Sequence, residues 1–166
     1  VPTARRNSAD RLTHSGDIKY MELDLFNKIV ADCKQRKPVL FGLGHDRILS
    51  NEEIKIFENT FQIALPPKYK DFISQYGGGY FGYANIYSLD NQSDFYIIKH
   101  NTTPFEKFLR IADNGCGDYY MLCIESQNYI EQLYFYEHDT KHICVTEYND
   151  IFEYLIKVGL KLKIDK

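Results

Sequence analysis

The sequence predicts an α+β domain, in which a largely antiparallel β-sheet of about 5–6 strands is flanked by N-terminal helices and a C-terminal helix. Apolar residues recur at three- and four-residue steps up to residue 76 and alternate from residue 81 onward, which indicates helices first and strands later. The links between the alternating segments are too short for the crossovers of a parallel sheet. With 14 Tyr and 11 Phe in 166 residues, the chain has enough apolar surface for a core of its own.

Three helices are expected before the strands. The first spans residues 20–37 along one apolar stripe and stops at Pro38. The second opens at residues 50–53, where Ser and Glu three residues apart form a capping box, and it runs through residue 61. The third covers residues 66–76, between a proline pair and a glycine triplet that bracket a short helix.

Six short segments rich in Tyr, Phe, Ile and Val follow, and turn residues separate them. Residues 139–141 suit a hairpin turn between the last two of these segments. Asn149 or Asp150 then caps a final helix that runs through Leu160. The predicted strands are residues 81–89, 95–99, 108–112, 119–125, 132–138 and 143–148.

Residues 1–16 differ from the rest of the chain, because they are polar and have no periodic apolar face. We expect them to be a flexible leader or an expression remnant, with residues 17–166 as a single domain. This stretch holds Arg5, Arg6 and Arg11 against Asp10, so the remainder is more acidic than the net charge of −3 indicates. A mildly acidic body disfavours nucleic acid as the main partner, since such binders concentrate Lys and Arg.

The four cysteines have no C-x-x-C pair, and no signal-peptide core precedes them. This favours free thiols in the reducing cytoplasm. The apolar runs are too short for a membrane span, so no membrane association is expected.

Several short strings, in a fixed order over about residues 50–160, resemble the SUKH superfamily (Smi/Knr-type domains). The chain departs from the family in one respect, because the family often carries Trp near its glycines or late strand and this sequence has none. The strings are IKIFE at residues 54–58, LPPKYKDFI at 65–73, GGG at 77–79, IADNGCGDY at 111–119, VTEY at 145–148 and FEYL at 152–155.

The resemblance implies an α+β fold, no cofactor and no enzymatic activity. It also implies a cytoplasmic immunity protein, whose partner is a cognate secreted polymorphic toxin domain, possibly a nuclease, neutralised by direct binding. The alternative is a scaffold or signalling adaptor of the Smi/Knr type, with several partners of modest affinity. The oligomeric state is left open between a monomer and a weak dimer.

Exposed Tyr and acidic residues are the expected partner-binding groups, because Tyr supplies contact area at low entropic cost and carboxylates attract basic partners. Residues 114–118, NGCGD, suit a turn that needs positive φ, and they can also present an acidic loop to Arg or Lys. The candidate partner-binding residues are Tyr80, Tyr83, Asp113, Asp118, Tyr119, Glu137 and Asp139.

Two chemical hypotheses are alternatives to this binding role. Cys116 between glycines is a candidate nucleophile, with His138 or His142 as base and Asp118 as orienting group. His138 and His142 are also four residues apart across the predicted hairpin, which is a weak zinc pattern without an obvious third ligand. The sequence favours neither, so no catalytic and no metal residue is assigned.

Overall fold

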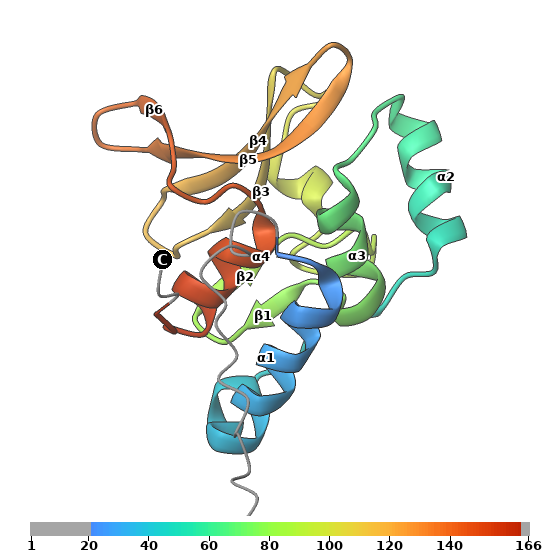
Figure 1. Cartoon of the computed structure of the whole chain (residues 1–166). Helices are drawn as coiled ribbons and strands as arrows, with labels where there is room; N and C mark the ends of the chain where they lie inside the picture. Colours follow the sequence, from blue (N-terminus) through green and yellow to red (C-terminus); the bar gives the residue numbers. More distant parts are fainter. Residues whose placement is uncertain (1–20, 164–166) are drawn as a thin grey trace, which may run out of the picture.

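A computed structural model describes residues 21–163, and the predicted leader, residues 1–16, lies outside them. The predicted α+β class is confirmed: helices come first, a six-stranded sheet follows and a helix ends the domain (Figure 1). The helices are α1 Leu23–Arg36, α2 Asn51–Phe61, α3 Pro67–Tyr76 and α4 Ile151–Tyr154, the last continued by a π-helical turn, Leu155–Gly159. The strands are β1 Gly79–Phe81, β2 Ala84–Ile86, β3 Phe108–Asp113, β4 Tyr119–Glu125, β5 Asn128–Glu137 and β6 His142–Val145.

The sheet is an antiparallel meander in the order β1-β2-β3-β4-β5-β6. Each strand pairs with its neighbour in the sequence, as the short links predict. Two register shifts interrupt the pairing, one in β3 between Arg110 and Ala112 and one in β4 between Leu122 and Ile124. Such bulges increase the local twist of a sheet.

One face of the sheet packs against the helices and forms the core. Phe26 of α1 stacks on Phe152 of α4 with ring centroids 4.4 Å apart, and both side chains are fully buried. Tyr120 of β4 packs against Tyr154 of α4 at the same centroid separation. Alternation along each strand therefore sends every second side chain to the face away from α1, α3 and α4.

Two carboxylates join α3 to the sheet and to α4. Helix α3 begins after Pro66, which has no side chain to cap it, and Glu131 of β5 instead accepts the backbone N–H of Lys68 at 2.9 Å. The Lys68 ammonium lies 2.5 Å from Asp150, whose other oxygen caps α4 by accepting the N–H of Glu153. The Asp150 side chain is 3% exposed and that of Lys68 is 17% exposed. Either charge would therefore be unfavourable in this place if its partner were removed.

The prediction of one strand over residues 81–89 is wrong. The chain folds there into β1 and β2 around a two-residue turn, with Phe81 paired to Ala84. Gly82 occupies the first turn position with φ of 59°, as hairpin turns of this length require. A Cβ at Gly82 would also lie 2.1 Å from the backbone oxygen of Gly159, so the turn lies directly against the C-terminal helix.

The prediction of a strand over residues 95–99 is also wrong, because residues Ile97–His100 form a 3₁₀ turn. The β-branched and aromatic residues there are typical of a strand. The segment meets only a single bridge, between Ser88 and Tyr96, so it has no continuous strand to pair with. Ile97 is nonetheless fully buried, and its N–H donates to the oxygen of Ser88.

The remaining elements differ from their predictions only at their ends. The capping box of α2 is present, with Ser50 and Glu53 each accepting the other's backbone N–H. Strand β5 starts four residues before the predicted position, and β6 ends at Val145. Within residues 21–163, no helix combines the length and apolarity that crossing a bilayer requires.

We expect Asp150→Asn to lower the free energy of unfolding by about 3 kcal/mol, since it leaves the Lys68 charge half-buried and unpaired. Asparagine still caps α4, so the change isolates the ion pair from the cap. Asp32→Asn is the matched control, because its ion pair with Arg36 is more than half exposed. Urea denaturation of both variants measures the two changes in the free energy of unfolding. Equal, small decreases would contradict a stabilising role for the Lys68–Asp150 ion pair.

Candidate functional site

The face of the sheet opposite the helices carries one row of side chains across all six strands. Direct cross-strand partners lie on the same face, and the register links each residue of this row to the next. We call it the cross-strand row. Its members, from β1 to β6, are Tyr80, Asn85, Asp113, Tyr119, Tyr136 and Ile143.

The β1–β2 end of the row is partly covered by the chain that follows β2. Phe95 packs edge-on against Tyr80 at 5.0 Å, and the His100 ring stacks on Tyr87 at 3.9 Å. Burial and the neighbouring Asp113 raise the pKa of Tyr87. Tyr80 nevertheless stays 41% exposed at the β1 end of the row, and Ile143 is 38% exposed at the β6 end.

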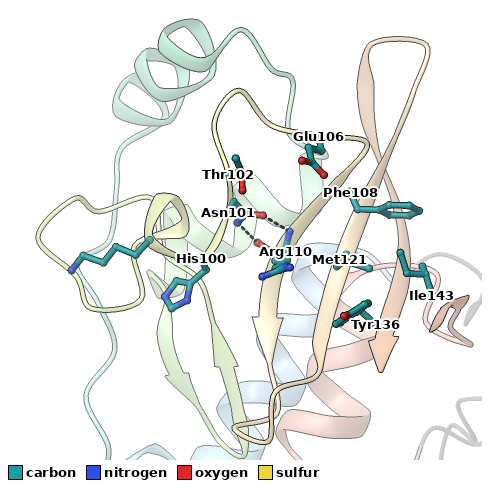
Figure 2. A pocket seen from close by; sticks show the side chains of 10 residues that line it. His100, Asn101, Thr102, Glu106, Phe108, Arg110, Met121, Tyr136 and Ile143 are labelled. Carbon is teal, nitrogen blue, oxygen red and sulfur yellow. Dashed lines mark hydrogen bonds between the residues drawn. The ribbon is translucent and has the colours of Figure 1, made fainter. Parts of the chain in front are cut away.

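A groove of about 420 Å³ lies over the part of the sheet formed by β3–β6. His100, Asn101 and Thr102 lie on one side of it and Met121, Tyr136 and Ile143 on the other, with Arg110 between them (Figure 2). Lys99, Glu106 and Phe108 complete its lining.

Asn101 fixes the wall of the groove to its floor. Its side-chain amide donates to the Arg110 oxygen at 3.0 Å, and its carbonyl oxygen accepts the Arg110 N–H at 2.9 Å. The same amide also donates to the oxygen of Ile97. Residues 97–101, which lack a strand partner of their own, are thus fastened to β3 by one side chain.

Aromatic contacts order the floor of the groove. The Arg110 guanidinium lies 4.2 Å from the centroid of the Tyr119 ring, and Tyr119 packs against Tyr136 at 6.1 Å. Phe108 meets Tyr134 edge-on at 5.4 Å. Rigid aromatic and arginine side chains of this kind dominate the energetics of protein interfaces.

A second cluster, the hairpin-edge cluster, joins the turn at residues 114–118 to the β5–β6 hairpin. It consists of Asn114, Asp118, His138 and Asp139. One Asp118 oxygen accepts both the backbone N–H of His138 at 3.0 Å and its ring nitrogen at 2.8 Å, and the other accepts the Asn114 amide. The opposite ring nitrogen of His138 lies 3.0 Å from Asp139.

These contacts shift both titrating groups of the cluster. The hydrogen bonds from the His138 backbone and ring hold the pKa of Asp118 below its usual value. The hydrogen bond to Asp118, with the nearby charge of Asp139, raises the pKa of His138 above its usual value. Residues 114–118 form the turn that the sequence predicts, with positive φ at Gly115 and Gly117.

The candidate residues from the sequence divide into three groups. Tyr80, Asp113 and Tyr119 belong to the cross-strand row. Asp118 and Asp139 belong to the hairpin-edge cluster, and Glu137 ends β5 beside it, accepting the Thr140 hydroxyl. Tyr83 is 63% exposed in the β1–β2 turn, next to the β1 end of the row, and the sheet order separates it from the hairpin-edge cluster.

Sequence reasoning missed Arg110, Tyr136 and Ile143, which define the accessible groove. Alternation within the predicted strands could have placed Tyr136 on one face of the sheet. The pairing register and the bulge at Arg110 decide which side chains stand side by side, and neither can be read from the sequence.

The structure does not assemble the chemical sites that the sequence raised. Cys116 is exposed, and among residues 21–163 its thiol has no hydrogen-bond partner, while both His138 ring nitrogens already face carboxylates. In the same described range, no three His, Cys, Asp or Glu side chains are grouped to hold a metal ion. Four free cysteines are present, of which Cys33 and Cys123 are buried.

Comparisons with known proteins place these features in a family. The family model described as SUKH_6 (SMI1-KNR4 cell-wall) matches residues 51–155, which span the region from α2 to α4. The crystal structure of a protein from Pseudomonas syringae pv. tomato aligns with a TM-score of 0.56 at 16% identity, over 82% of this chain and 99% of that chain. At that identity the likeness shows a shared fold. No curated protein matches the chain significantly.

We expect the ring of His138 to titrate above the usual range for histidine, with Asp118→Asn lowering its pKa more than Asp139→Asn does. The contribution of charged His138 to stability is fully present below the usual histidine pKa, and it disappears as the pH rises through the raised pKa. An NMR pH titration of the His138 ring protons measures this. A pKa that is insensitive to Asp118→Asn would show that the cluster does not form.

Proposed function

Because the chain belongs to the SUKH (SMI1-KNR4) family, we propose that it is a non-enzymatic immunity protein that neutralises a cognate toxin domain by binding it. The observation that carries the proposal is the part of the cross-strand row on β4–β6, together with the groove beside it. A helix layer covers one face of the sheet, whereas Tyr136, Ile143 and Val145 stay accessible on the other.

The composition of this surface suits a protein partner. Interfaces are enriched in Tyr, Met and Arg, and their central side chains are well packed before binding. Arg110, Met121 and Tyr136 meet this description, since each is held on a strand and lines the groove. Ile143 and Val145, 38% and 61% exposed, extend it with apolar area that a partner would bury.

Binding without a chemical step is consistent with how the polar groups of the site are used. The His100 ring is stacked on Tyr87 and its Nε2 lies 3.2 Å from the Asp94 oxygen. His138 is held between two carboxylates. Inhibition would then come from covering the active site or an essential surface of the toxin, in a cytoplasm that keeps the four thiols free.

To test this, the tagged chain is used to capture its partner from the cells that produce it, and the bound protein is identified by mass spectrometry. The captured domain is then expressed in a test host, alone and together with this chain. We expect the domain to arrest growth and the chain to restore it. If none of the captured proteins is harmful, the immunity proposal fails and the adaptor of the Smi/Knr type takes its place.

Ile143→Asp tests whether the open face makes the contact. A charge in the apolar part of an interface should weaken partner binding at least about tenfold and reduce the rescue of growth. Ile56→Asp is the matched control, since Ile56 is 64% exposed on α2, away from this face. Equal rescue by both variants would show that the toxin binds elsewhere on the chain.

A further inference from the structure

Arg110 is the charged side chain of the groove whose position is most strongly fixed. Both backbone groups of Arg110 bond to the Asn101 amide, and its guanidinium stacks on Tyr119. Among residues 21–163, the guanidinium has no hydrogen bond and no carboxylate within ion-pair distance. Its donors therefore face the groove without a protein acceptor.

An arginine held in this way selects for a particular kind of partner group. The planar guanidinium matches the two oxygens of a carboxylate, and stacking on an aromatic ring leaves its edge donors available. A partner that covered the groove without supplying an acceptor would bury these donors unpaired, which is unfavourable. A carboxylate partner turns the same donors into a charge-assisted pair.

The other charged residues in the lining of the groove are Lys99 and Glu106. His100 lies on the same side of the groove as Asn101, and Glu106, the acidic residue of the lining, lies near Phe108 (Figure 2). Lys99 also lines the groove, but its ammonium donates to the Ser93 oxygen at 2.9 Å and lies 3.6 Å from the exposed Asp94 carboxylate. Arg110 is therefore the cation of the lining that has no hydrogen-bond or carboxylate partner among residues 21–163, in a chain whose net charge is −3.

We propose that this groove takes an acidic segment of the partner protein, with an Asp or Glu side chain on Arg110. An adjacent apolar side chain would lie on Met121, Tyr136 and Ile143. This inference rests on the proposed function and deepens it, because it assigns an acidic loop to a partner that the overall charge would suggest is basic.

Nucleic acid fits the groove less well, although aromatic rings on a sheet can stack bases. Binders of single strands follow the backbone with a run of basic side chains. Here the row also carries Asp113, and the hairpin-edge cluster beyond it carries Asp118 and Asp139. Phosphates that tracked along the sheet would meet these carboxylates.

The NMR signal of the Met121 methyl group reports binding in the groove. The chain has two methionines, both only 3% exposed: Met121 belongs to the lining of the groove, and Met21 belongs to the core cluster and serves as an internal control. The probes are capped octapeptides centred on Glu-Phe-Glu, Gln-Phe-Gln or Lys-Phe-Lys, and an octamer of thymidylate, each titrated to about 10 mM, beyond the weakest affinities of interest.

We expect the Glu-Phe-Glu peptide to move the Met121 signal saturably and the Met21 signal not at all, with weaker binding at high salt. The neutral peptide should bind at least about tenfold more weakly, and the lysine peptide more weakly still. If the lysine peptide or the thymidylate octamer moves Met121 more strongly, or if none of the probes moves it, the acidic-segment proposal is overturned.

Variants assign the effect to Arg110. Arg110→Gln should weaken binding of the Glu-Phe-Glu peptide about tenfold, and Arg110→Lys by less, because lysine keeps the charge but loses the two-pronged geometry. Lys55→Gln, an exposed change on α2, is the control and should bind like the parent protein. An unaltered affinity in Arg110→Gln would refute the role of Arg110. The role of Arg110 would also be refuted if Arg110→Gln still restored growth and Ile143→Asp did not. That outcome would leave the proposed function intact.

Discussion

The fold depends on the attachment of two helices to one face of the sheet through the Lys68, Glu131 and Asp150 group. Glu131 supplies the cap that Pro66 cannot give to α3, and Asp150 caps α4 while neutralising Lys68. Since α3 and α4 come from distant parts of the chain, this group fixes where both lie relative to β5. The apolar core, including the Phe26–Phe152 stack, fills the space that these attachments define.

The helices cover one face of the sheet and leave the other face open. The sequence strings that resemble the family mainly stabilise the covered side. Glu58 accepts the Leu65 N–H that leads into α3, and the buried Tyr69 hydroxyl donates to the Tyr87 oxygen. The Asn114–Asp118 turn is held internally and by His138. The residues of the groove, such as Arg110 and Ile143, lie outside these strings, which suits a scaffold that carries different partner surfaces.

The sequence was sufficient where local chemistry decides the structure, as at the capping box of α2 and the Pro–Gly brackets of α3. It was insufficient at residues 95–99, where strand-like residues have no strand to pair with and form a 3₁₀ turn instead. It placed Tyr80, Asp113 and Tyr119 among the candidates by residue type. Their arrangement in one row, and the groove around Arg110, depend on register and on a bulge, which are tertiary properties.

The order of the groove bears on the choice between the proposed immunity protein and the alternative adaptor. Its floor lies on strands, its wall is bonded to β3 through Asn101, and its arginine is stacked on a tyrosine. A surface ordered before binding loses little conformational entropy when the partner arrives, so its contact area is converted efficiently into affinity. Adaptors with many partners use flexible surfaces that repack. A pre-ordered groove whose arginine has no acceptor among residues 21–163 is better suited to a single, tightly bound partner, and the proposed immunity function requires such a partner.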